Sequence, residues 1–200
     1  AVKKLINLAI KHKIRYFIQS SSAAVYGNSK DRFVSETSET NPISPYGSSK
    51  LAAESVISES IRAGNIEGTS LRYFNAAGAS LPELMEKATS NLIPRVIYEY
   101  KNGITPVIYG DDYDTDDGSC VRDYVHVTDV AAAHVLVAEK FKTTKISNVL
   151  NIGTGHGHSV KEVVQMIKEK IGSNVDPKIT SRRPGDPDFL VAKVDLAASE

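Results

Sequence analysis

The sequence predicts an α/β fold, in which part of a doubly wound parallel sheet is joined to a smaller mixed region. Two observations support this prediction. Apolar stripes with helical spacing alternate with short runs of β-branched and aromatic residues, the order expected when crossover helices link parallel strands. Polar and glycine residues follow the ends of these runs, and such sheets bind their ligands at the carboxyl ends of their strands.

The first half of the chain shows the alternation most clearly. Residues 1–13 carry apolar side chains at helical spacing, and residues 15–22 form an aromatic and aliphatic run that ends in serines. A helix is expected at residues 45–64, because Ser44 is a good N-cap, proline suits the first helical position, and glycine suits the end. Residues 69–74 follow as a second strand.

The second half of the chain predicts three helices, one strand and the start of a last helix. The helices are expected near residues 91–102, 127–141 and 159–171, where apolar side chains again recur at helical spacing. An acidic stretch precedes the second of them. A strand is expected at residues 148–152, and a last helix is expected to begin near Asp195.

The composition is that of an ordinary globular chain that binds something small. The 200 residues are 41% hydrophobic, and Lys+Arg and Asp+Glu balance at 24 each. No basic run with interleaved aromatic residues predicts a nucleic-acid partner, and no apolar run is long enough to predict a membrane span. Cys120 is the only cysteine, which fits a reducing compartment such as the cytoplasm.

The first residues, AVKKLINLAIKHKI, read as the middle of an amphipathic helix, and no initiator methionine precedes them. The sequence therefore predicts a segment of a longer protein.

The stretch SPYGSSK places a phenol and an ammonium side by side. Tyr46 and Lys50 are separated by four positions, which leaves roughly 5–6 Å between their Cβ atoms on one helix face. A phenol with a pKa of roughly 10 is a poor base at neutral pH, but a nearby positive charge stabilises the phenolate. Ser22, at the end of the first predicted strand, is expected to face this phenol, because strand ends and helix starts share the ligand edge.

The chain contains, in order, SSSAAVYG, the Tyr46-x-x-x-Lys50 pair, LRYFNAAGAS, LIPRVI, VIYGDDYDTDDGSCVRDYVHVTDVAAAHV, NIGTGHGHSV and RRPGD. Together these blocks resemble the extended short-chain dehydrogenase/reductases, and among them the UDP-hexose 4-epimerases. The resemblance implies a partial Rossmann-like, NAD-binding sheet domain at residues 1–78. It also implies a substrate-binding region at 79–118, a return to the sheet domain at 119–153, and a truncated substrate-binding region at 154–200.

The resemblance implies that UDP-glucose and UDP-galactose are interconverted through a 4-keto sugar, with NAD as cofactor. Tyr46 would be the base at the sugar 4-hydroxyl, Ser22 would hydrogen-bond that oxygen, and Lys50 would hold the nicotinamide ribose. Phe74 and Ser20 would also lie at the cofactor, together with Tyr46 and Lys50. The substrate-binding residues that the resemblance implies are Ser22, Asn75, Asn91, Leu92, Val107, Ile108, Tyr109, Arg122, Arg183 and Asp186.

Three other functions are compatible with the sequence. Nucleotide-sugar 4,6-dehydratases resemble the chain too, but they carry an acid just after the strand-end Ser/Thr, where this chain has Ala23 and Ala24. Epimerases of other UDP-sugars are a second alternative, although Leu190 at the position of the size gate favours a hexose that is not acetylated. A non-catalytic Rossmann-fold binding module is the third, and it would be expected to have lost Tyr46 or Lys50.

Two patterns resemble binding sites without meeting their requirements. Gly153, Gly155 and Gly157 have the spacing G-x-G-x-G rather than that of a dinucleotide-binding turn. The acidic run DDYDTDDG resembles a calcium loop, but its glycine falls one place late, at Gly118. No metal site is predicted.

The glycine-rich fingerprint of the family is not in this chain, so the isolated chain is expected to bind NAD poorly. The resemblance also implies a homodimer that pairs through helices of the sheet domain, with the Tyr46 helix, residues 45–64, as the candidate.

Overall fold

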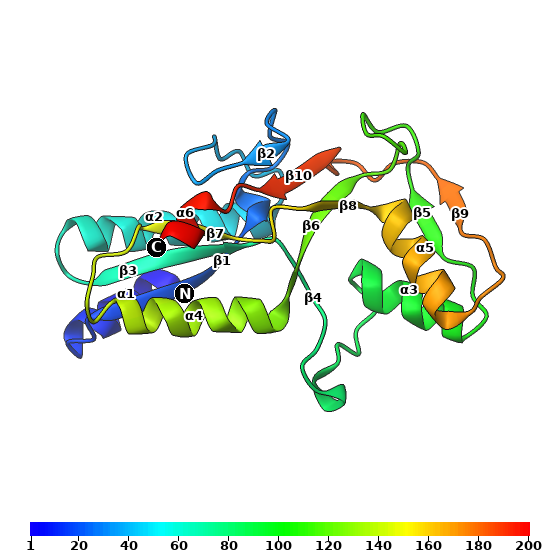
Figure 1. Ribbon diagram of the computed structural model, residues 1–200. Helices are drawn as coiled ribbons and strands as arrows, with labels where there is room; N and C mark the ends of the chain where they lie inside the picture. Colours follow the sequence, from blue (N-terminus) through cyan, green and yellow to red (C-terminus); the bar gives the residue numbers. More distant parts are fainter.

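The computed structural model describes residues 1–200, and its centre is a three-stranded parallel sheet (Figure 1). The strands are β1 (Tyr16–Ser22), β3 (Glu67–Tyr73) and β7 (Val149–Ile152), in the order β1-β3-β7. The parallel alternation confirms the predicted fold class. It also brings the three carboxyl ends to one edge, because Ser22 is paired with Tyr73 and Tyr73 with Ile152.

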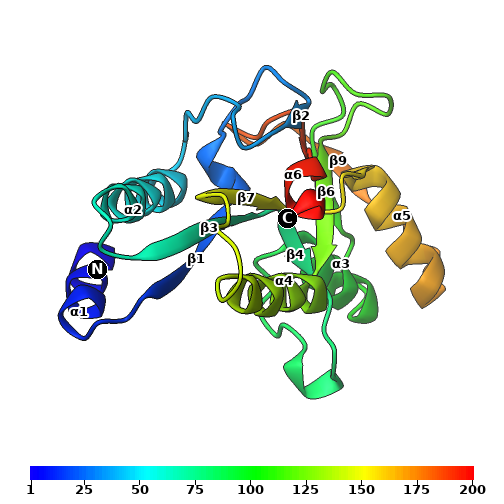
Figure 2. The same cartoon turned by 60° about the vertical axis from the view of Figure 1, so that its left-hand side comes forward.

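Helices cover both faces of this sheet, as a doubly wound fold requires (Figure 2). On one face lie α1 (Val2–Lys11) and α2 (Pro45–Arg62), with α4 (Val127–Lys140) on the other. The apolar cores show the same division. Side chains from α1, α2, β1 and Ile66, just before β3, form one cluster around Ile57, and side chains from β3, α4 and β7 form another around Leu71. The short α6 (Asp195–Ser199) packs against β7.

A second sheet was not predicted from the sequence. Four parallel strands follow the order β2-β10-β6-β4, and β8 (Gly157–Ser159) pairs antiparallel with β6. They are short, and each pairs with a strand distant in the chain, so they carry little local signal. Their bounds are β2 Phe33–Val34, β10 Phe189–Ala192, β6 Val121–His126 and β4 Asn75–Ala77.

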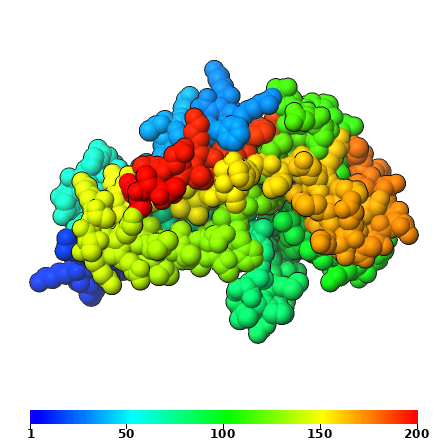
Figure 3. All heavy atoms as spheres, viewed as in Figure 1, coloured from blue at the N-terminus to red at the C-terminus, as the bar shows by residue number.

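A small lobe is built from two helices and two short strands, and it lies on the right of Figure 1. Helices α3 (Leu92–Lys101) and α5 (Val160–Ile171) pack together around Val96 and Val164. Strand β5 (Val107–Tyr109) pairs in parallel with β9 (Lys178–Thr180), and neither strand was predicted. The loop that carries the short η2 turn (Pro82–Leu84) projects from the body of the molecule (Figure 3).

The start of α2 is defined by local chemistry. Ser44 Oγ accepts a 3.1 Å hydrogen bond from the Gly47 amide, as the N-cap prediction required, and Pro45 is the first helical residue. A Cβ at Gly47 would lie 2.4 Å from the Ala24 carbonyl oxygen. Glycine therefore allows α2 to begin directly against the short η1 turn (Ala23–Val25) that follows Ser22.

Candidate functional site

A cavity of about 1090 Å³ lies at the carboxyl edge of β1 and β3, beside the predicted catalytic residues. Its walls come from the end of β1, the first turn of α2, the segment from the end of β3 through β4, the η2 loop, α3 and β6. About half of the lining residues are hydrophobic, which suits a site that encloses a ligand and orients it through a few polar groups. The predicted site residues that line it are Ser22, Tyr46, Phe74, Asn75, Asn91 and Leu92.

Tyr46 lines the cavity, and Lys50 lies directly beside it on α2. The Lys50 ammonium is 5.4 Å from the centroid of the Tyr46 ring, and Tyr46 is 56% exposed. Lys50 Nζ also donates a 2.8 Å hydrogen bond to the carbonyl oxygen of Ser20. This bond uses one of three N–H groups, so the ammonium retains donors for a ligand.

The hydroxyl of Ser22 stabilises the local turn and can still donate a hydrogen bond to a ligand. Its Oγ accepts a 3.2 Å hydrogen bond from the Ala24 amide and so caps the η1 turn. Because this bond occupies only a lone pair, the hydroxyl hydrogen stays available to a ligand. Ser22 and Tyr46 line the same cavity, as the strand-end and helix-start positions suggested.

Two tyrosines in the cavity wall were not predicted as site residues. The Tyr73 hydroxyl lies 2.8 Å from Ser20 Oγ and 2.6 Å from His134 Nε2, and burial raises its pKa. Burial raises the pKa of Tyr124 to about 12, which keeps it a neutral donor. Tyr124 follows Arg122 by two positions on β6, so the two side chains lie on the same face of that strand. Tyr124 could be predicted as a site residue from this spacing only if the strand itself were known.

The remaining predicted substrate residues form a second group outside this cavity. Arg122 is 8% exposed and donates a 2.9 Å hydrogen bond to Asp186. The Arg183 guanidinium lies 4.0 Å from the centroid of the Tyr109 ring. The structure thus pairs Arg122 with Asp186 and Arg183 with Tyr109, and Tyr109 shares strand β5 with Val107 and Ile108. Ser20 and Lys50 do not line the cavity either, although Ser20 is bonded to Tyr73, which does.

The glycine turn after β7 is occupied by a side chain of the protein itself. Asp123 is fully buried, and its carboxylate accepts hydrogen bonds from the Thr154 amide at 2.8 Å and the Gly155 amide at 3.0 Å. These are the amides that a phosphate would need, so the turn is a structural element, as its spacing indicated. Asp123 is also not the partner of Arg122, which pairs with Asp186 instead.

The acidic run is divided among separate partners. Asp112 pairs with Arg182 at 2.6 Å, and Asp114 pairs with Arg32 at 3.1 Å. Asp117 accepts hydrogen bonds from Ser119 and Ser159. The structure holds no group of three or more His, Cys, Asp or Glu side chains arranged to bind a metal ion.

One acid in the cavity was not anticipated. Both carboxylate oxygens of Glu86, in the η2 loop, accept hydrogen bonds from Asn91 Nδ2, at 2.8 and 3.0 Å. The dehydratase pattern places its acid next to Ser22, where this chain has alanines. Glu86 lines the cavity from the segment that leads into α3.

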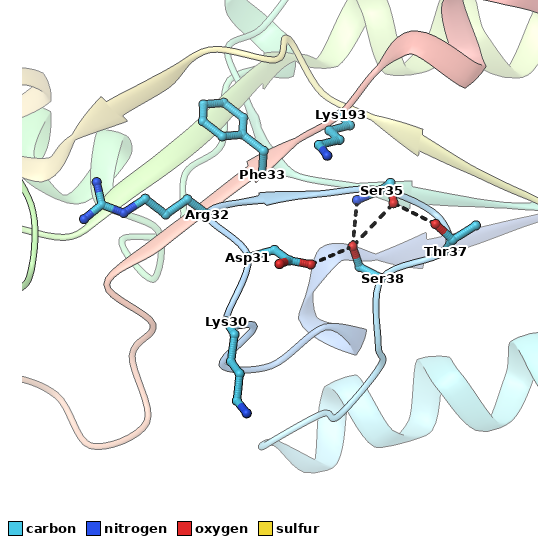
Figure 4. A pocket seen from close by; sticks show the side chains of 8 residues that line it. All are labelled: Lys30, Asp31, Arg32, Phe33, Ser35, Thr37, Ser38 and Lys193. Atoms are coloured by element: carbon cyan, nitrogen blue, oxygen red, sulfur yellow. Dashed lines mark hydrogen bonds between the residues drawn. The ribbon is translucent and has the colours of Figure 1, made fainter.

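A second hollow of about 540 Å³ lies over β2 and the loop after it (Figure 4). It is hydrophilic and open, and its hydroxyl groups have partners within the loop: Ser35 Oγ lies 3.0 Å from Thr37 Oγ1, and Ser38 Oγ accepts from the Ser35 amide at 3.0 Å. None of the predicted site residues lines it. The chemistry-bearing residues therefore concentrate at the larger cavity. The lining residues of this hollow are Lys30, Asp31, Arg32, Phe33, Ser35, Thr37, Ser38 and Lys193.

A parallel sheet with a serine, a tyrosine and a lysine at its carboxyl edge is typical of the nucleotide-dependent dehydrogenase and epimerase enzymes. Residues 1–153 match the NAD dependent epimerase/dehydratase family, and the chain belongs to that family.

Within this family, the chain is similar to several UDP-glucose 4-epimerases. The chain is 40% identical, over 90% of its length, to the UDP-glucose 4-epimerase of Lactobacillus helveticus. It superposes with a TM-score of 0.91 and 40% identity, over 99% of its length, on the UDP-glucose 4-epimerase of Brucella ovis solved with NAD. The Bifidobacterium longum UDP-glucose 4-epimerase, solved with NAD⁺ and UDP, gives a TM-score of 0.87 at 37% identity over the whole chain.

The chain spans 56% of the first of these relatives and 62% and 61% of the two solved structures. No helix in the structure combines the length and the apolar character needed to cross a membrane.

Proposed function

We propose that the complete protein interconverts UDP-glucose and UDP-galactose with NAD as cofactor. The observation that carries this proposal is the placement of Ser22 and Tyr46 in one cavity with Asn75 and Asn91, beside the Lys50 ammonium. A base, an oxygen-binding hydroxyl and amide groups for a polar ligand are thereby present at a single sheet edge. The similarity to UDP-glucose 4-epimerases supports the choice of substrate.

The residues of this chain fit the nicotinamide end of NAD. The Lys50 ammonium has unused donors for ribose hydroxyls, and Phe74 and Tyr46 offer aromatic surface beside them. Bound NAD would supply a hydride acceptor and donor at the sugar C4. The adenosine end has no partner at the glycine turn after β7, because Asp123 occupies its amides.

Proton transfer at the sugar 4-oxygen is assigned to side chains of this chain. Tyr46 Oη takes the proton from the 4-hydroxyl and later returns it, while Ser22 Oγ hydrogen-bonds the same oxygen. The Lys50 ammonium, 5.4 Å from the phenol ring, stabilises the phenolate during this exchange. General acid–base catalysis of this kind contributes roughly 10²–10⁴-fold to the rate.

The nucleotide is assigned to the polar residues farther from Tyr46. Asn75, Asn91 and Leu92 would contact the sugar and diphosphate, and Asn91 must then exchange its bonds to Glu86 for the ligand. Val107, Ile108 and Tyr109 on β5 would line the uracil. Arg122 and Arg183 would bind phosphate oxygens, for which the planar guanidinium is suited, and Asp186 would accept from the ribose hydroxyls.

Dehydration and other UDP-sugars are less well supported. Ala23 and Ala24 form the η1 turn after Ser22 and cannot protonate a leaving hydroxyl, and the acid that lines the cavity, Glu86, belongs to the segment that leads into α3 rather than to the turn beside Ser22. Leu190, the position expected to act as the size gate, is 7% exposed within the core around Tyr26 and does not line the cavity, so the preference for a hexose without an acetyl group rests on the resemblance and the named relatives. We also propose that the enzyme is cytoplasmic and forms a homodimer through α2. The chain is proposed to divide into four regions, with boundaries after residues 78, 118 and 153.

The test is a Tyr46→Phe variant of the complete protein, assayed for conversion of UDP-galactose to UDP-glucose. The rate is expected to fall by roughly 10²–10⁴-fold, since the ring remains and only the proton carrier is lost. Tyr16→Phe is the matched control, because Tyr16 stacks on Phe141 at 5.2 Å through its ring, in the core beneath α4. A parental rate in Tyr46→Phe would contradict the assignment. Heat protection by UDP without any conversion would favour the non-catalytic binding module instead.

A further inference from the structure

A row of buried polar side chains crosses the central sheet just beneath its ligand edge. Ser21 on β1 is paired in register with Arg72 on β3, and Arg72 is paired with Asn151 on β7. They are 2%, 4% and 0% exposed. Neighbouring strands place paired residues on the same face, so the three side chains point together toward the side covered by α2. Polar groups in such a position need partners, because unpaired burial is costly.

The partner comes from the helix that carries Tyr46. Glu54 of α2 is 6% exposed, and Arg72 binds its carboxylate with two donors, Nε to Oε1 at 3.1 Å and Nη2 to Oε2 at 2.7 Å. Ser21 Oγ donates to the same Oε1. One carboxylate therefore joins α2 to both β1 and β3, at neighbouring positions of the sheet.

The same network reaches the turn that follows Ser22. Arg72 Nη1 donates a 2.9 Å hydrogen bond to the Tyr26 hydroxyl, and Tyr26 in turn donates to Asn151 Oδ1 at 2.7 Å. Asn151 Nδ2 donates the last hydrogen bond of the network to the carbonyl oxygen of Val34, on β2, at 3.0 Å. The end of β1, the η1 turn, α2, β3, β7 and β2 are thus held by one set of directional bonds.

Glu54 lies on the same stripe of α2 as the proposed catalytic pair. Tyr46, Lys50 and Glu54 follow one another at intervals of four residues, so Glu54 sits about 12 Å along the axis from Tyr46 at 1.5 Å per residue. Apolar packing around Ile57 holds α2 onto the sheet, but such packing is not directional. The hydrogen bonds of Glu54 limit sliding and rotation of the helix.

We propose that Glu54, Arg72 and Ser21 are positioning residues, which set the height and rotation of α2 so that Tyr46 faces Ser22. The proposal rests on the function proposed above for Tyr46. Glu54 and Arg72 lie outside the cavity. Ser21 borders it but is 2% exposed, and its hydroxyl donates a hydrogen bond to Glu54, so the network acts through the placement of the helix. Its loss should slow the chemical step and leave the binding of UDP-hexose largely unchanged.

The first test replaces the ion pair by apolar side chains in the complete protein, as the double variant Glu54→Leu/Arg72→Met. Replacement of a whole buried ion pair by apolar residues often preserves stability. A folded variant is therefore expected, with kcat lowered at least tenfold and KM within twofold of the parent. A stable double variant with parental kcat would overturn the proposal.

The second test uses the hydroxyl of Ser21, whose removal is a smaller change. Ser21→Ala is expected to lower kcat severalfold, and Ser21→Thr, which keeps the hydroxyl, is expected to restore it. If the threonine variant is as slow as the alanine variant while both remain folded, the hydrogen bond to Glu54 is not the relevant property.

Ile57→Ala is the control for general loosening of α2, because it removes apolar packing and leaves the polar row intact. It should lower the melting temperature yet keep kcat within twofold. Hydrogen exchange of α2 amides is measured in all variants, and it requires no activity. Faster exchange is expected in the first turns of α2 in the polar-row variants, and only toward its C-terminal half in Ile57→Ala. Identical exchange patterns in the two classes would reject the positioning role, whereas a parent without epimerase activity would reject only the proposed function.

Discussion

Lys50 Nζ donates a 2.8 Å hydrogen bond to the carbonyl oxygen of Ser20, so the ammonium of α2 is tied to the last residues of β1. This bond brings the charged end of a flexible side chain to the edge where Ser22 and Tyr46 meet the cavity. It also leaves the Lys50 side chain partly ordered before any ligand arrives. The cost of ordering a lysine side chain on binding is therefore reduced.

Removal of this ammonium should affect catalysis more than folding. Lys50→Met keeps the apolar stem and loses the charge that stabilises a Tyr46 phenolate, so kcat for UDP-galactose is expected to fall by roughly tenfold to a hundredfold. Steady-state kinetics on the complete protein measure this. Lys11→Met, on the exposed end of α1, serves as the control. Equal kinetics in the two variants would show that Lys50 has no part in the reaction.

Gly47→Ala should displace the start of α2. The added Cβ would lie 2.4 Å from the Ala24 carbonyl oxygen, so the first helical turn or the η1 turn must move. We expect a loss of about 1–3 kcal/mol in the free energy of unfolding together with a lower kcat. Urea unfolding and kinetics measure the two effects. Ser48→Ala, one residue further on an exposed face, should change neither by much, and a fully active, fully stable Gly47→Ala would refute the close approach.

Asp123→Asn should destabilise the fold strongly for an isosteric change. The carboxylate accepts from the Thr154 and Gly155 amides and from the Ala192 amide at 3.2 Å. An asparagine presents an NH₂ group to at least one of these donors, which leaves buried groups unpaired at about 1–3 kcal/mol each. Urea unfolding gives the difference. The control is Asp116→Asn, an exposed carboxylate of the acidic loop, whose stability should match that of the parent.

Stability should decline at high pH in part through Tyr124. Its pKa is raised by burial to about 12 in the folded protein, against a value near 10.0 when exposed. The folded state therefore holds the phenolic proton more tightly than the unfolded state. The corresponding stabilisation is complete below the unfolded pKa and is lost as the pH rises through the folded pKa.

The measurement is urea unfolding of the parent and Tyr124→Phe at neutral pH and again at about pH 11, between the two pKa values. The parent should lose more free energy of unfolding between the two conditions than the phenylalanine variant. Burial also raises the pKa of Tyr26 and Tyr100, so the phenylalanine variant should still lose some free energy of unfolding at high pH. Identical losses would mean that Tyr124 is not buried in solution.

Elements with local signals were predicted well from the sequence. Helix α2 was expected from Ser44, Pro45 and its apolar stripe, and α5 from Ser159, which forms a capping box with Glu162. Both signals lie within a few residues of the helix start. The strands β6 and β10 were not predicted, because their pairing joins residues about 68 positions apart, as in Phe189 with Val121. The residues next to each strand do not indicate which strand it pairs with.

The candidate site divides in the same way. The neighbouring positions of Tyr46 and Lys50 could be predicted because helical geometry alone places positions four apart on one face, and the approach of Ser22 because strand ends gather at one edge. Tyr73 and Tyr124 were missed, since they reach the cavity only through the placement of β3 and β6.

The sequence by itself determined the fold class, the family resemblance and the phenol–ammonium pair, because each depends on spacing along the chain. Only the tertiary structure decided that Arg122 pairs with Asp186, that Asp123 fills the glycine turn, and that Glu54 is joined to Arg72 and Ser21. Hydrogen bonds between distant residues depend on strand register and on the position of a helix over a sheet. Those relations exist only once the whole chain has packed.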